Sequence, residues 1–255
     1  MSLTIVTVPC LQDNYAYLAR DEATGQTALI DAPEAAPILA ALAERGWGLD
    51  QILITHHHGD HIDGVAEIRE QTGARVVGAA ADAHRLPPLD MQVSEGDHVA
   101  IGETEGVVLD VSGHTVGHIA YHFPGAKAAF TADSLMCLGC GRVFEGTMPM
   151  MWESLSKLAA LPADTLIHSG HEYTAANARF ALTVEPGNDR LQARAKYIDE
   201  TRAAGRPTVP VTLSEELATN PFLRASQPEL KAAVGMSDAP DAQVFAEVRT
   251  RKDNF

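Results

Sequence analysis

Four imidazoles and a carboxylate lie within seven residues in the first quarter of the chain. In the stretch THHHGDH, residues 55–61, His56 and His58 are separated by one residue and precede Asp60 and His61. Imidazole nitrogens and carboxylate oxygens are common ligands of zinc, iron and manganese. On a loop, residues i and i+2 can converge on one ion, so His56 and His58 form a natural pair that Asp60 and His61 cannot easily join. The spacing therefore predicts a metal site for which this loop supplies only part of the ligands.

Three further candidate ligands follow predicted strands: His114 in VSGHTVGH, Asp133 in FTADS and His171 in HSGHEYT. The resulting seven donors are too many for one four-coordinate ion and suit two ions that share a carboxylate. Asp133 is the candidate bridge, because a carboxylate has two oxygens and imidazole offers one lone pair. A hydroxide between two ions about 3.5–4 Å apart is nucleophilic at neutral pH. This predicts hydrolysis of a carbonyl or phosphoryl compound.

The other histidines have a plainer interpretation. A histidine outside such a pattern more often makes ordinary hydrogen bonds or lies on the surface. We therefore expect His118, four residues after His114, to orient a ligand by hydrogen bonding at most. The histidines interpreted as non-ligands are His57, His84, His98, His122 and His168.

The ligands need strands to place them. An apolar strand over residues 51–55 runs into the histidine loop and a helix is predicted behind it over 62–71, so the loop lies at the carboxyl end of a strand, a usual place for an active site. Further strands are predicted over 3–9, 15–19, 27–31, 75–78, 107–111, 119–123, 128–132 and 165–168, and further helices over 34–45 and 152–161. After residue 172 only helical patterns follow, over 175–184, 189–204, 214–218, 228–234 and 242–251. We expect an α/β (α+β) catalytic domain over residues 1–172 and a helical domain over 173–255.

Composition excludes several classes of partner. The formal charge of −15 repels phosphate backbones and anionic membranes, so neither nucleic acid nor a membrane is expected. An anionic substrate would need a local group of cations. Cys10, Cys137 and Cys140 are an odd number and do not suggest a disulfide framework, and the first residues do not resemble a signal peptide. We expect a cytoplasmic protein, and a monomer because no long apolar stripe requires a partner.

The stretch THHHGDH resembles the signature of the metallo-β-lactamase superfamily, whose fold is a four-layer αββα sandwich. Within it the chain is most similar to the hydroxyacylglutathione hydrolases, also called glyoxalase II. The similarity runs through almost the whole chain, in VPCLQDNYAYL, GCGRVFEGT, GHEYTAANARFALTVEPGN and VRTRKDNF. The last three motifs are specific to that family. The resemblance implies hydrolysis of S-(2-hydroxyacyl)glutathione thioesters, such as S-lactoylglutathione, as the second step of methylglyoxal detoxification.

The resemblance also assigns roles to residues. It gives the first metal to His56, His58 and His114, the second to Asp60, His61 and His171, and both to Asp133; the catalytic residues are Asp60 and Asp133. Two divalent ions are implied, zinc first, with iron or manganese as alternatives. For the binding of glutathione it implies Arg142, Phe144, Tyr173, Arg249 and Lys252. The three cations among them would pair with the carboxylates of glutathione. Two positions depart from the family pattern. The family often has Lys at position 142, and Arg142 keeps that positive charge. Some members have Tyr at position 144, and Phe144 lacks its hydroxyl.

Three alternatives stay open from the sequence. A glutathione persulfide dioxygenase of the same fold uses a single iron held by two His and one Asp, so His61 and His171 would not be ligands. A non-catalytic metal-binding protein would need only four closed ligands. Cys137 and Cys140 form a C-x-x-C pair that could be redox-active, although the GCG stretch belongs to the resembling motif.

Overall fold

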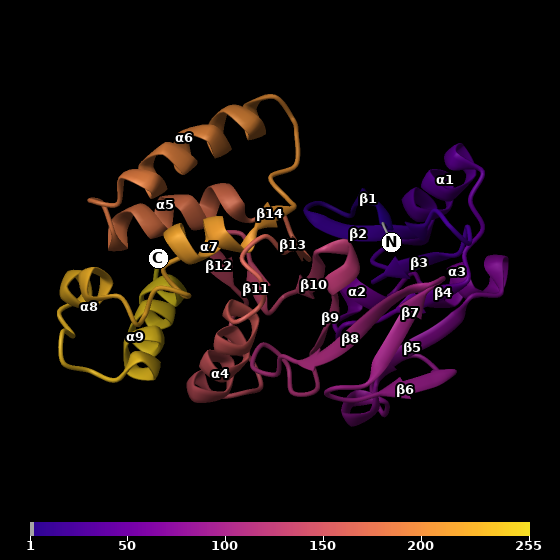
Figure 1. Ribbon diagram of the computed structural model, residues 1–255, viewed down its shortest axis with the longest axis horizontal. Coiled ribbons are helices and arrows are strands. Elements are labelled where there is room, and N and C mark those ends of the chain that lie inside the picture. Colours follow the sequence, from indigo (N-terminus) through magenta and orange to yellow (C-terminus); the bar gives the residue numbers. More distant parts are fainter. Residues whose placement is uncertain (1–2) are drawn as a thin grey trace. The chain divides into compact units, whose positions relative to one another are not determined.

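The computed structural model describes residues 3–255, which form two compact units (Figure 1). The first unit contains the described residues up to Val111 and the segment Val116–Ala132. The second contains Ser112–Thr115 and Asp133–Phe255. The functional division predicted between residues 172 and 173 falls inside the second unit and stays a prediction.

A mixed six-stranded sheet in the order β1-β2-β3-β4-β5-β6 belongs to the first unit. Its strands are β1 (Leu3–Cys10), β2 (Asn14–Asp21), β3 (Thr27–Ile30), β4 (Gln51–Leu53), β5 (Arg75–Ala79) and β6 (Met91–Val93). The first three pair antiparallel, and β3 to β6 run parallel. Every residue of β3 and β4 is buried, as is typical of strands covered on both faces. Because β3 and β4 are parallel neighbours, Asp31 and the histidine loop follow them at the same edge.

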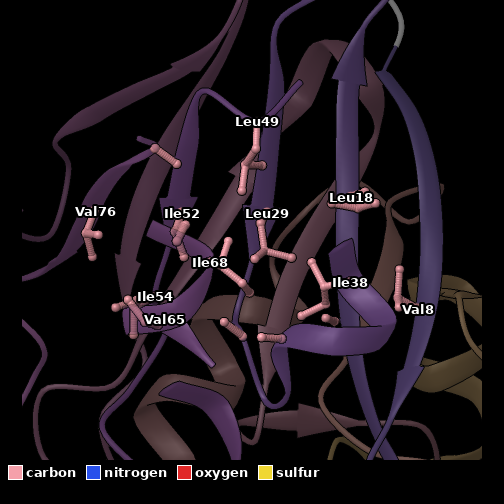
Figure 2. Close-up of a cluster of buried hydrophobic side chains, with 14 of the residues drawn as sticks. Val8, Leu18, Leu29, Ile38, Leu49, Ile52, Ile54, Val65, Ile68 and Val76 are labelled. Atoms are coloured by element: carbon pink, nitrogen blue, oxygen red, sulfur yellow. The ribbon is translucent and has the colours of Figure 1, made fainter. Parts of the chain in front are cut away.

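Two helices cover one face of this sheet, α1 (Ala35–Arg45) and α3 (Val65–Thr72). Figure 2 shows Ile38 of α1 and Ile68 of α3 among the strand residues Leu29 and Ile52. All four side chains are fully buried. Burying a side chain of this size stabilises a fold by about 1.5–3 kcal/mol, so this cluster fixes the helices on the sheet.

A second, antiparallel run of strands packs on the other face. It consists of β7 (His98–Ile101), β8 (Thr104–Asp110), β9 (Ile119–Phe123) and β10 (Ala128–Ala132). The rings of Tyr17 and Phe130 lie 5.6 Å apart, and the Tyr121 hydroxyl donates to the Ile54 carbonyl at 2.8 Å. The first unit is therefore layered as helices, sheet and sheet.

The second unit is mostly helical. Its elements are the hairpin β11 (Leu135–Met136) and β12 (Gly139–Cys140), the antiparallel pair β13 (Leu166–Ser169) and β14 (Val211–Thr212), and the helices α4 (Met148–Ala159), α5 (Thr174–Val184), α6 (Asp189–Ala203), α7 (Leu213–Thr219), α8 (Pro228–Val234) and α9 (Asp241–Asp253). Figure 1 shows α5 and α6 side by side. Leu138 of the hairpin turn packs with Ala181 of α5 and Leu191 of α6.

The predicted order, strands and helices followed by a mainly helical region, is confirmed, but the expectation of helices alone after residue 172 is wrong because the chain forms β14 there. The prediction of one helix over 62–71 is wrong, because the chain forms α2 (Gly59–Ile62) and then α3. The break falls where a Cβ on Gly64 would lie 2.9 Å from the Ala35 nitrogen, so the close approach of the two backbones requires glycine there. The prediction also missed β6, β7, β14 and the hairpin of β11 and β12. None of the helices within residues 3–255 has the length and apolar character needed to span a bilayer.

Candidate active site

The histidine loop carries four of the seven predicted ligands, and all four belong to the first unit. His56 and His61 are completely buried, and the His56 ring centroid lies 4.8 Å from that of His58 and 4.2 Å from that of His61. The short helix α2 begins after His58 and places Asp60 in its first turn. The Nε2 atom of His61 is 3.9 Å from Asp60 Oδ2. Like-charged imidazolium rings would repel at these distances, so the cluster suits neutral rings around a cation.

Hydrogen bonds on the Nδ1 atoms fix how two of these rings are protonated. The Thr55 hydroxyl donates to Asp31 Oδ2 at 2.8 Å, so it accepts from His56 Nδ1 at 3.0 Å. The Nδ1 atom of His61 donates to the same Asp31 oxygen at 2.8 Å. Each ring then keeps its lone pair on Nε2, which is the arrangement of a metal-ligating histidine held by an outer hydrogen bond.

Sequence reasoning missed Asp31 and Asn14. Asp31 is 2% exposed, and its other oxygen accepts from the Thr55 backbone N–H at 2.8 Å. The sequence feature that could have indicated Asp31 is its position directly after the buried strand β3, which runs parallel to β4. Asn14, at the start of β2, donates from Nδ2 to Asp60 Oδ2 at 3.0 Å and to the Asp60 carbonyl at 2.9 Å. Both residues hold predicted ligands in place.

Two neighbouring histidines make other contacts. His57 Nδ1 lies 2.8 Å from Asp82 Oδ2, and the Asp82 side chain is fully buried. The His118 ring stacks on His56, with centroids 4.5 Å apart and planes at 12°. His118 therefore supports a predicted ligand through ring packing, which the sequence did not predict.

The second unit brings together the three remaining predicted ligands. Asp133 Oδ2 lies 3.4 Å from His114 Nε2 and 3.3 Å from His171 Nε2. Two ligands of one tetrahedral ion, each about 2.0–2.1 Å from it, are themselves about 3.4 Å apart. All three residues are at most 5% exposed. One carboxylate oxygen thus lies at ligand spacing from two imidazoles, and these donors fit a divalent metal ion.

The loop around His114 is shaped to present its Nε2 atom. His114 Nδ1 donates to the Arg142 carbonyl at 2.7 Å, which again leaves the lone pair on Nε2. Gly113 has φ +151°, and a Cβ there would lie 2.7 Å from the Met151 sulfur. The Phe144 ring packs on His114 with centroids 5.3 Å apart. A side chain at position 113 would therefore collide with Met151, next to the loop that carries His114.

The five predicted glutathione-binding residues all lie in the second unit. The Tyr173 ring stacks on the ligand candidate His171, with centroids 4.7 Å apart. Arg142 and Arg249 both pair with Asp253 Oδ1, from Nε at 3.1 Å and from Nη2 at 3.0 Å. Arg249 is 4% exposed, whereas the Arg142 side chain is 54% exposed.

Lys252 lies against two aromatic rings. Its ammonium lies 5.2 Å from the Phe180 ring centroid and 5.1 Å from that of Phe255. Partial burial, and then the positive charges of Arg249 and Arg179, lower its pKa, while Asp253 opposes the shift. Lys252 therefore loses its positive charge at a lower pH than an ordinary lysine does.

The C-x-x-C pair has the character of buried structural thiols. Burial raises the pKa of Cys140 to about 11, although the Arg249 charge partly opposes the shift. Burial also raises the pKa of Cys137 far above its ordinary value. The thiolate is the reactive form, so neither residue is set up for thiol exchange at neutral pH.

Comparisons with known proteins agree with these features. The family model described as "Metallo-beta-lactamase superfamily" matches residues 12–171, and the one described as "Hydroxyacylglutathione hydrolase C-terminus" matches residues 172–255. The chain is 68% identical to a hydroxyacylglutathione hydrolase of Cereibacter sphaeroides and 64% identical to one of Ruegeria pomeroyi, each over 100% of both chains. Among solved structures it is similar to ETHE1 from Myxococcus xanthus, with a TM-score of 0.67 and 28% identity over 99% of this chain and 98% of that one.

Proposed function

The chain belongs to the hydroxyacylglutathione hydrolase family of the metallo-β-lactamase superfamily, and on this premise we propose how its own residues carry out the hydrolysis of glutathione thioesters. It is a glyoxalase II enzyme with the metallo-β-lactamase fold and a helical C-terminal region. Its reaction is the hydrolysis of S-(2-hydroxyacyl)glutathione, such as S-lactoylglutathione, to glutathione and the 2-hydroxy acid.

The proposed centre uses the seven ligands that the sequence predicts. His56, His58 and His114 bind one divalent ion, Asp60, His61 and His171 bind the other, and Asp133 binds both. The observation that carries this proposal is the position of one Asp133 oxygen at 3.4 and 3.3 Å from two imidazole nitrogens. A closed structural site needs only four ligands, whereas seven donors are proposed here. Zinc is the first choice, with iron and manganese compatible with the same ligands.

When bound, the two ions supply a hydroxide nucleophile at neutral pH and polarise the thioester carbonyl. The protein's own groups position these reactants. Asp60, held by Asn14 at 3.0 Å, accepts a hydrogen bond from the attacking water in addition to its ligand role. Asp31 and the Arg142 carbonyl keep His61 and His114 in the tautomer that presents Nε2. A thiolate leaves readily because a thiol has a pKa of about 8.5, so no strong general acid is needed.

The helical region over 173–255, together with the segment after Asp133, is proposed to bind the glutathione part. Arg142, Arg249 and Lys252 supply positive charge for its two carboxylates, and Phe144 and Tyr173 supply ring surface. Since Asp253 pairs with both Arg142 and Arg249, it offsets part of this charge but leaves the group net positive. This local charge is what an anionic substrate needs on a chain with a net charge of −15.

The remaining proposals concern the state of the enzyme. We take it to act as a cytoplasmic monomer that binds neither nucleic acid nor membranes. The net charge of −15 supports the absence of anionic macromolecular partners. The cysteines Cys10, Cys137 and Cys140 are all buried as free thiols, which agrees with a reducing compartment.

Metal content and thioester hydrolysis, measured on the same preparation, test the proposed centre. Protein purified without added metal should contain close to two divalent ions per chain and should lose hydrolysis when a chelator removes them. Re-addition of zinc, iron or manganese should restore it. One iron per chain, together with oxygen uptake on glutathione persulfide, would instead identify the dioxygenase chemistry that the sequence left open.

Lys252 should give substrate binding an alkaline limit. Because the lysine pKa is lowered, its positive charge is lost as pH rises through a value below the ordinary 10.5. The Kd of an S-alkylglutathione, which cannot be hydrolysed, should therefore rise from neutral pH upward sooner than an ordinary lysine would allow. Lys252→Arg should remove this limit, because arginine stays charged in that range. A Kd profile that is identical in wild type and Lys252→Arg would exclude Lys252 from the substrate site.

A further inference from the structure

The hairpin of β11 and β12 begins two residues after Asp133 and lies entirely inside the second unit. Every residue from Asp133 to Gly141 is buried. The turn residue Leu138 has φ +54°, a left-handed conformation that is strained for a leucine. Buried backbone N–H and C=O groups need hydrogen-bond partners. The surroundings of this hairpin therefore decide whether it can keep its conformation.

Two side chains of the α7 region supply these partners. Glu216 Oε2 accepts from the Leu138 N–H at 2.9 Å. Asn220 Nδ2 donates to the carbonyls of Met136 at 3.2 Å and Gly139 at 3.0 Å, so it joins the two strands of the hairpin. Further donors reach the same hairpin from α5 and α9: Asn177 to the Cys137 carbonyl and Arg249 to the Cys140 carbonyl.

Glu216 and Asn220 are themselves firmly held. Asn220 Nδ2 also lies 2.8 Å from Glu216 Oε2, so its two N–H groups are shared among this oxygen and the two hairpin carbonyls, and both residues are completely buried. Arg194 of α6 pairs with the other Glu216 oxygen and donates to the Thr219 hydroxyl at 2.6 Å. A buried carboxylate with its charge and hydrogen bonds satisfied is a rigid support.

The far end of the hairpin contacts two proposed metal ligands. The Gly141 N–H donates to the Ser134 carbonyl at 3.1 Å. A Cβ on Gly141 would lie 2.0 Å from the Asp133 carbonyl oxygen and 2.9 Å from His114 Nδ1. The next residue, Arg142, provides the carbonyl that holds His114 Nδ1 at 2.7 Å. A shift of the hairpin would therefore move the Asp133 backbone and release His114.

We propose that Asn220, with Glu216, is a positioning residue for the metal centre: it holds the hairpin that sets Asp133 and His114. The inference rests on the proposed metal centre. It gives the helical region a second role besides substrate binding, since α7 supports a metal ligand more than 80 residues earlier in the chain. Loss of a hydrogen bond made directly to a ligand typically lowers metal affinity by about 10–100-fold, so for Asn220, which acts through the hairpin, we expect an effect at the lower end of that range.

The test compares Asn220→Ala and Asn220→Ser with Asn188→Ala as the matched control. Asn188 also donates to a backbone carbonyl, that of Ala218 at 3.1 Å, and it caps α6, but it does not contact the hairpin. In Asn220→Ala the metal should leave about tenfold faster during dialysis against a chelator. The kcat for the thioester should fall while KM changes less than about twofold, and excess metal should restore part of kcat.

The control and the milder variant decide between positioning and general stability. Asn188→Ala should lower Tm but keep the wild-type metal content and kcat. Asn220→Ser keeps a polar group in the buried site, although its side chain is too short to join both strands. It should show the same loss of metal and kcat as Asn220→Ala or a smaller one, and it serves as the test if Asn220→Ala does not fold. If the Asn220 variants lower Tm yet retain metal and kcat as Asn188→Ala does, the inference is wrong. Wild-type protein without metal or hydrolysis would instead overturn the proposed function.

Discussion

Replacing Asp133 with alanine should abolish thioester hydrolysis, with kcat/KM reduced on the order of a thousandfold or more, in a protein that stays folded. The effect is large because one side chain serves two proposed ions. Its Oδ2 atom lies 3.4 Å from His114 Nε2 and 3.3 Å from His171 Nε2. Metal ions contribute several kcal/mol to the stabilisation of charge in such reactions, and each 1.36 kcal/mol corresponds to a factor of ten in rate. Initial rates with S-lactoylglutathione and the metal content per chain measure the loss.

The matched control is Asp199→Ala, which removes the same carboxylate from an exposed position on α6. It should retain the activity and metal content of the wild type, since a surface substitution of this kind usually changes stability by at most about 0.5 kcal/mol. The circular dichroism of both variants should match that of the wild type. If Asp133→Ala kept its metal and most of its activity, Asp133 would not be the shared ligand and the ligand assignment would fail.

The proposed metal ligands were inferred from the sequence because metal chemistry leaves a local signature. His56, His58, Asp60 and His61 lie within six residues, and few other functions require so many donors in one loop. The distant candidates His114, Asp133 and His171 were found by a second rule, that polar residues just after strands gather at one edge of a sheet. Both rules depend on residue type and strand ends, which can be read without a structure.

The residues that support these ligands could not be found in the same way. Asp31 and Asn14 belong to residue types that are common in turns, so their identities alone predict only turns. Glu216 and Asn220 contact the hairpin across 78 to 84 residues of sequence. Nothing in a helical pattern indicates which of its polar residues will be buried against a distant loop. The hairpin itself was missed for the same reason, since two-residue strands held by side chains carry almost no periodicity.

Asp31 offers the sharpest test of whether such support matters for metal binding. Asp31→Asn removes the charge that faces His61 Nδ1 at 2.8 Å and should lower metal affinity by about 10–100-fold, with a corresponding loss of kcat at limiting metal. Competition with a metal-binding dye gives the affinity, and Tm of the metal-free protein reports folding. The chain provides its own control in Asp82→Asn, because Asp82 makes the same contact, at the same distance, with the neighbouring His57.

Both carboxylates are buried, and each holds a histidine of the same loop. They differ in that His61 is a proposed ligand and His57 is not, and in their second partners, which are Thr55 for Asp31 and Arg85 for Asp82. Metal affinity should therefore fall much more in Asp31→Asn than in Asp82→Asn, even if Tm falls equally in both, because only Asp31 sets the tautomer of a ligating ring. Equal losses of affinity would mean that anchoring of the loop, rather than orientation of His61, governs binding. An unchanged affinity in Asp31→Asn would remove Asp31 from the support of the metal centre.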